Sequence, residues 1–131
     1  MLHRRFLVLS VCALLFAGCA NAEKDMAELR ANPQGDLAQK VMILTLPDGE
    51  AIPVNYVRED DYVYTGADGF WWRQLRGDGS RVEVYIKGED LTGLGRAVEH
   101  DKERAKEILA KVRPGFERFS PAVPIEIKID E

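Results

Sequence analysis

The stretch of this chain whose residue types could do chemistry is Tyr64–Leu75 (YTGADGFWWRQL). Two adjacent tryptophans there follow a Gly-Ala-Asp-Gly turn and precede a single cation, Arg73. The residues before the turn are typical of a strand and those after it of a helix, and such a junction presents side chains and free backbone N–H groups at a rim. We therefore predict a binding place for a flat ligand. The competing interpretation is that at least one of Trp71 and Trp72 packs in the core, as large aromatic side chains commonly do.

Other reactive combinations are sparse in this sequence. His100 is the one histidine after the first 22 residues, and the two cysteines, Cys12 and Cys19, lie near the N-terminus. A His/Cys metal cluster is therefore excluded, and no metal site is predicted. A Ser-His-Asp triad would need Ser80 or Ser120 to meet His100, and neither serine lies in a nucleophile-elbow sequence. No catalytic residue is predicted.

Residues 1–18 are typical of an export signal, in this case of the lipoprotein type. A short basic start precedes Phe6–Ala17, an uncharged apolar run that is too short for an ordinary transmembrane helix. Ala17-Gly18-Cys19 resembles the lipobox of bacterial lipoproteins, in which Cys19 receives the lipid and becomes the first mature residue. The alternatives are ordinary secretory cleavage after Ala22 and an uncleaved membrane anchor. We expect an exported protein of the cell envelope, lipid-anchored on the periplasmic side of the membrane or free in the periplasm.

The composition from Cys19 onward limits the classes of function. The remaining 113 residues are enough for one modest domain with one core. Loss of residues 1–18 changes the formal net charge from −4 to −6, because this segment contains two arginines and no acidic residue. That acidity argues against binding to nucleic acid. No disulfide framework is left, so the fold must rest on its apolar core.

Residues 19–39 are predicted to form a tether between the anchor and the folded domain. The segment Glu23–Gln39 is polar and is interrupted by Pro33 and Gly35, with a single helical turn expected at Met26–Arg30. A tether of this kind lets a lipid-anchored domain clear the membrane surface.

Residues 40–131 are predicted to form a small split β-barrel, mainly β with one or two short helices (α+β). Val41–Leu46 is a continuous apolar run, typical of a strand buried on both faces, and it begins an antiparallel meander of three strands. A helix capped by Asp101 is expected to run to about Val112. About six antiparallel strands are expected, namely Val41–Leu46, Ala51–Arg58, Tyr62–Thr65, Arg81–Lys87, Leu91–Glu99 and a closing strand that buries Val123, Ile125, Ile127 and Ile129.

This order of elements resembles the split β-barrel proteins that bind flavin or deazaflavin, especially the deazaflavin-dependent nitroreductase group. The resemblance runs from about Val41 to Ile129, and Trp72-Arg73-Gln74-Leu75 is similar to that family's Trp-x-x-Asn-Leu helix. It implies an FMN or deazaflavin cofactor, oxidoreductase chemistry and a homodimer. It also implies contacts of the ring with Asn55, Thr65 and Ala67, with Trp72 beside the ring and Arg73 at the cofactor's tail.

One segment departs from that family. The family's basic, Gly-rich segment between the first two strands helps to bind the cofactor's phosphate, whereas Leu46–Glu50 (LPDGE) is short and acidic and would repel a phosphate. A second hypothesis is therefore a non-catalytic lipoprotein whose barrel binds a small hydrophobic or haem-like ligand or a protein partner. Whether the chain is an enzyme stays open, because a fold does not set a function.

Overall fold

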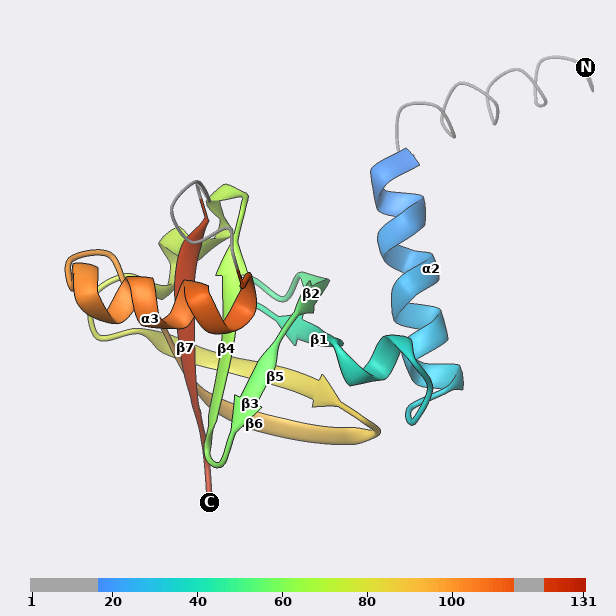
Figure 1. Ribbon diagram of the computed structural model, residues 1–131. Helices are drawn as coiled ribbons and strands as arrows, with labels where there is room; N and C mark the ends of the chain where they lie inside the picture. The colour runs from blue at the N-terminus through green and yellow to red at the C-terminus, as the bar shows by residue number, and fades with distance from the viewer. Residues whose placement is uncertain (1–16, 115–121) are drawn as a thin grey trace, which may run out of the picture.

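The computed structural model describes residues 17–114 and 122–131, with side chains from residue 21 onward (Figure 1). Nearly all of the predicted export signal, residues 1–16, lies outside the described residues. The described elements, in chain order, are α2 (Ala17–Ala31), η1 (Leu37–Gln39), β1 (Val41–Thr45), β2 (Ala51–Asn55), β3 (Val57–Glu59), β4 (Tyr62–Ala67), η2 (Phe70–Leu75), β5 (Ser80–Ile86), β6 (Glu89–Ala97), α3 (Lys102–Val112) and β7 (Val123–Ile129).

The strands form one curled antiparallel sheet in the order β2-β1-β5-β6-β7-β4-β3. Strands β2 and β3 are the two edges of this sheet, yet only Tyr56 separates them along the chain. The edges must therefore meet, and the sheet curls into a half-closed barrel that leaves little free edge (Figure 1). The Thr65 hydroxyl on β4 spans the junction by donating to the backbone carbonyl of Asn55 on β2, at 2.6 Å. The predicted fold class, an α+β split barrel, is confirmed.

Two details of the predicted strands are wrong. The expected strand Ala51–Arg58 is interrupted at Tyr56, so the described chain has seven strands rather than six. The expected three-stranded meander is split, because β1 pairs with β2 and β5, while β4 pairs with β3 and β7. Local sequence patterns predict a strand but do not determine its second neighbour, which depends on residues distant in the chain.

The barrel interior is filled by every second residue of the strands, as the alternating sequence of β5 predicts. Leu75, at the end of η2, adds a side chain with no exposed surface. The interior side chains contributed by β1, β5 and β7 are Met42, Leu44, Val82, Val84, Ile86, Ile125, Ile127 and Ile129, all buried.

The N-terminal helix packs on the outside of the barrel. The predicted turn at Met26–Arg30 is part of the longer helix α2, whose Leu29 is buried against Val41 and Ile43 on the outer face of β1. Strand β1 is therefore covered on both faces, and its continuous apolar sequence is explained. The segment predicted as a tether carries packing contacts, and the division of the chain at residue 40 stays a prediction. Among the described helices, none combines the length and the apolar character needed to cross a bilayer.

Helix α3 begins as predicted, because the Asp101 carboxylate accepts a hydrogen bond from the Arg104 backbone N–H at 3.0 Å. The Arg104 guanidinium holds the helix on the sheet: it donates to the Glu126 carboxylate on β7 at 2.8 Å and to the Tyr64 hydroxyl on β4 at 3.0 Å. Figure 1 shows α3 lying across these two strands. The hydrogen bonds with Glu126 raise the pKa of the Arg104 side chain, so this contact stays charged.

The packing of α2 predicts a large cost for Leu29→Ala. Leu29 is 2% exposed, so its truncation should lower the free energy of unfolding by about 2–3 kcal/mol through lost transfer energy and an unfilled cavity. The matched control is Leu94→Ala on β6, where the leucine is 42% exposed and the loss should stay below about 1 kcal/mol. Urea unfolding of the full chain measures both, and equal losses would show that α2 does not pack on the barrel.

Candidate functional site

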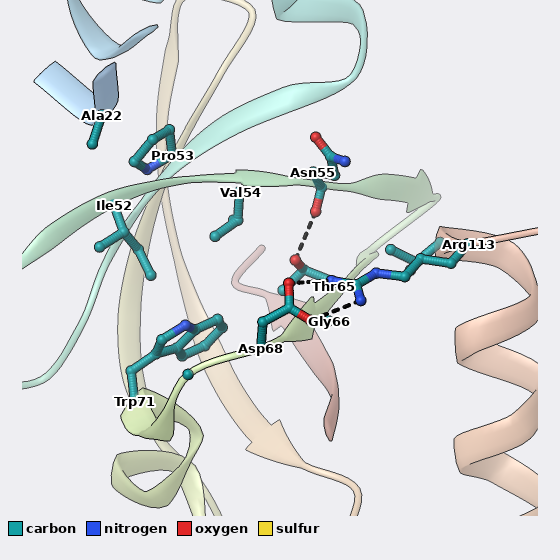
Figure 2. A pocket seen from close by; sticks show the side chains of 12 residues that line it. Ala22, Ile52, Pro53, Val54, Asn55, Thr65, Gly66, Asp68, Trp71 and Arg113 are labelled. Carbon is teal, nitrogen blue, oxygen red and sulfur yellow. Dashed lines mark hydrogen bonds and ion pairs between the residues drawn. The ribbon is translucent and has the colours of Figure 1, made fainter. Parts of the chain in front are cut away.

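A pocket of about 420 Å³ lies where the two sheet edges meet (Figure 2). It opens between β2, β4, the loop before η2 and the C-terminal end of α3, and Ala22 of α2 adds to its wall. Its volume lies in the range of small-molecule sites. The described lining residues are Ala22, Ile52, Pro53, Val54, Asn55, Thr65, Gly66, Asp68, Gly69, Trp71, Val112 and Arg113.

One end of this pocket is an apolar slot. Ile52 and Val54 are two positions apart on β2, so their side chains point to the same side of the strand. Figure 2 shows the Trp71 ring across the pocket from them. All three side chains are half-buried and pack against the barrel core. A flat ligand with two apolar faces fits between an indole ring and two aliphatic side chains.

The middle of the pocket holds one buried hydroxyl. Thr65 is 1% exposed, and its only hydroxyl proton is used in the hydrogen bond to the Asn55 carbonyl. Toward a ligand the Thr65 oxygen can therefore act only as an acceptor. Figure 2 shows the Asn55 amide on the other side of β2, and Asn55 is exposed. Asn55 thus contributes backbone to the pocket, and Thr65 contributes an oxygen with acceptor capacity only.

The other end of the pocket is closed by a bidentate ion pair. The Arg113 guanidinium donates from Nη1 to Asp68 Oδ1 at 2.8 Å and from Nη2 to Asp68 Oδ2 at 2.7 Å. These hydrogen bonds hold the pKa of the Asp68 carboxyl below its usual value and raise the pKa of the Arg113 side chain, so both groups are charged at neutral pH. They are the only ionisable side chains among the described lining residues, and the formal charge of this lining is zero.

The structure brings only part of the predicted cofactor-contacting set to this pocket. Asn55 and Thr65 line it, whereas Ala67 is 2% exposed inside the barrel. Trp72 and Arg73 lie outside the lining: Trp72 is half-buried against the core, and the exposed Arg73 guanidinium stacks on Phe70 at 4.7 Å. Cofactor contact by these five residues stays a prediction.

The short 3₁₀ helix decides which tryptophan reaches the pocket. Residues in such a helix are about 120° apart around the axis, so adjacent side chains cannot share one wall. Trp71 therefore faces the slot, while Trp72 lies under the Arg76 guanidinium, 4.5 Å from its ring centre. Neither tryptophan is fully buried, and both pack partly against the core.

The acidic turn between β1 and β2 holds η2 in place. The Gln74 amide donates to Asp48 Oδ2 at 3.1 Å, and the Asp48 backbone N–H donates to Gln74 Oε1 at 3.1 Å. The acidic turn that departs from the resembled family's basic segment is thus paired with Gln74 of η2. This contact positions the helix that carries Trp71.

The sequence pattern did not indicate the ion pair. It favoured Trp72 over Trp71 and placed Ala67 and Arg73 at the ligand, whereas Trp72, Ala67 and Arg73 do not line the pocket. Asp68 was assigned only to a turn, and Arg113 lies 45 residues later, so no local pattern joins them. His100 borders a different hollow, beside Gly77 and Arg96, and not this pocket. Among the described residues, no three His, Cys, Asp or Glu side chains are grouped so that they could hold a metal ion.

The chain shares its fold with solved split-barrel structures. No protein-family model and no curated protein matches its sequence. A "Putative Pyridoxamine 5'-phosphate oxidase" from Listeria innocua superposes with a TM-score of 0.52 at 21% identity, over 82% of this chain and 94% of that chain. A FAD-binding protein from Mesorhizobium loti (TM-score 0.47, 18% identity, 82% of this chain and 87% of that one) and a general stress FMN/FAD binding protein from Xanthomonas citri (0.47, 20%, 84% of each) are also similar. The first likeness shows the fold: the chain is a split β-barrel of the kind seen in that Listeria structure.

The buried Thr65 hydroxyl predicts a specific cost for Thr65→Val. Valine keeps the shape but leaves the Asn55 carbonyl without its donor, so the free energy of unfolding should fall by about 1–3 kcal/mol. Thr92→Val is the matched control, because the Thr92 hydroxyl donates to Asp130 at an exposed position and its loss should cost about 0.5 kcal/mol or less. Urea unfolding of both variants provides the comparison, and equal costs would contradict a special role of the junction between β2 and β4.

Proposed function

We propose that this chain is an exported split-barrel protein that binds the ring of a flavin-type cofactor, FMN-like or deazaflavin, in the pocket between β2, β4 and η2. The observation that carries the proposal is the slot between Trp71 and the pair Ile52 and Val54. The likeness in fold to a protein named as an oxidase supports the same class of function. The sequence resemblance to flavin- and deazaflavin-binding barrels supports it independently.

The residues present fit the ring of such a cofactor. A flavin or deazaflavin ring is flat, with apolar faces and polar edges that include an N–H donor. The slot suits the faces, and the Thr65 oxygen is an acceptor at the polar edge. A bound cofactor would supply electron or hydride transfer, while the chain would place the ring and exclude water from it.

A non-catalytic binding protein is the second candidate function. It is favoured by the pocket's lack of a free acid or base among the described lining residues, since Asp68 is held by Arg113. A haem-like ligand has less support than a flavin. None of the described lining residues is His, Met, Cys or Tyr, the side chains that usually ligate haem iron.

The proposed ring site predicts that Trp71→Ala weakens flavin binding. Loss of the stacking surface should raise the Kd for FMN or riboflavin about tenfold, and Trp71→Phe should recover part of it. Titration of the full chain, followed by quenching of flavin fluorescence, measures the change. Trp72→Ala is the matched control, because Trp72 is adjacent and equally half-buried but outside the pocket. A loss of affinity in Trp72→Ala with none in Trp71→Ala would reject this site.

We also propose that the protein is anchored in the cell envelope through a lipid on Cys19, with the membrane as a partner through that anchor. The sequence of residues 1–19 supports this location. A homodimer is a further proposal that rests on the family resemblance alone.

The anchor proposal predicts that Cys19→Ser abolishes incorporation of labelled fatty acid and moves the protein from the membrane fraction to the soluble fraction. Cys12→Ser is the matched control, because Cys12 lies within the predicted signal and should leave labelling unchanged. Mass spectrometry of the mature N-terminus gives a second readout. A mature chain that begins at Glu23 and carries no lipid would mean ordinary secretory cleavage after Ala22.

A further inference from the structure

We infer that this pocket selects a planar ligand without a phosphate, so that riboflavin, rather than FMN or FAD, is the flavin it prefers. The inference rests on the proposed function and names its ligand class. The observation behind it is the ion pair at the polar end of the pocket, which leaves the described lining residues without net charge.

The cation that a phosphate would need is already occupied. Arg113 is the only cation among the described lining residues, and both of its terminal nitrogens donate to Asp68. A flavin phosphate monoester carries a charge of about −1.5 to −2 at neutral pH. To reach Arg113 it must displace a bidentate carboxylate or lie beside it, and either arrangement brings like charges together.

Arg73 and Arg76, the described cations carried by η2 and its C-terminal end, do not replace Arg113. The Arg73 guanidinium lies on Phe70, and Arg76 is 3.2 Å from the Glu99 carboxylate while it covers Trp72. Neither residue lines the pocket. The turn after β1, which contacts η2 through Asp48 and Gln74, carries Asp48 and Glu50 and adds negative charge. The described surroundings of the slot therefore contain no phosphate cradle.

An uncharged hydroxylated tail fits this end of the pocket better than a phosphate does. Hydroxyl groups can donate to a carboxylate, whereas phosphate oxygens mainly accept. The Asp68 side chain is 65% exposed and keeps lone pairs that Arg113 does not use. A ribityl chain could therefore bond to Asp68 while the ring occupies the slot beside Trp71.

The test is a comparison of affinities for riboflavin, FMN and lumiflavin, which carries a methyl group in place of the flavin tail, measured on the full chain by fluorescence quenching at fixed low salt. We expect riboflavin to bind about tenfold more tightly than FMN. Asp68→Asn leaves the charge of Arg113 uncompensated and should shift the ratio of affinities about tenfold toward FMN. Arg113→Gln leaves the charge of Asp68 uncompensated and should shift the ratio of affinities about tenfold toward riboflavin. The double variant should restore the ratio of the native chain.

The matched control is Asp130→Asn. Asp130 forms a bidentate ion pair with Arg81, also at the surface, and neither residue lines this pocket. The substitution of Asp130 leaves the charge of Arg81 uncompensated outside this pocket, and the ratio of affinities for riboflavin and FMN should stay unchanged. Tighter binding of FMN than of riboflavin by the native chain, or an unchanged ratio in both Asp68→Asn and Arg113→Gln, would overturn the inference while ring binding stands. Absence of binding by all three compounds would overturn the proposed function and this inference with it.

Discussion

The structure depends on one geometric constraint, the passage of the chain from one edge of the sheet to the other at Tyr56. This residue is buried at the corner, where its backbone N–H donates to Lys40 and its hydroxyl donates to the Ala38 carbonyl, both at 3.0 Å. Burial raises the pKa of the Tyr56 hydroxyl and keeps it a neutral donor. Strands β2 and β3 both adjoin this corner but stand at opposite ends of the strand order, so the sheet must close on itself. The junction of β2 with β4 is thereby built into the fold.

The candidate site is a consequence of that junction. The sheet edges meet there without a continuous ladder of backbone hydrogen bonds, which leaves a hollow. Elements from distant parts of the chain complete the walls of this hollow. The contact of Asp48 with Gln74 positions η2, and the Asp68–Arg113 pair joins the loop before η2 to the end of α3. The same ion pair that ties these elements together also neutralises the pocket. The proposed ligand selectivity thus rests on two side chains that also support the structure.

The proposed ring site and the proposed lack of a phosphate site rest on different residues of this barrel. The fold is shared with a solved structure at 21% identity, and a likeness at that level shows the fold and not the chemistry of the pocket. In this chain the stacking surface comes from Trp71 and β2, whereas the two charged side chains of the described lining are Asp68 and Arg113. Because separate residues carry the two properties, the proposed contacts to the ring and to the tail of a ligand are independent of each other.

The sequence by itself determined the local features of this protein. The alternation of Val82, Val84 and Ile86, the apolar run of β1, the cap at Asp101 and the helical start after the Gly-Ala-Asp-Gly turn depend on periodicity and nearest neighbours, and the structure has them all. Only the tertiary structure decided the break at Tyr56, the order of the strands, the choice of Trp71 over Trp72 and the pairing of Asp68 with Arg113. These depend on the phase of a short 3₁₀ helix and on contacts across 45 residues, which no local pattern contains.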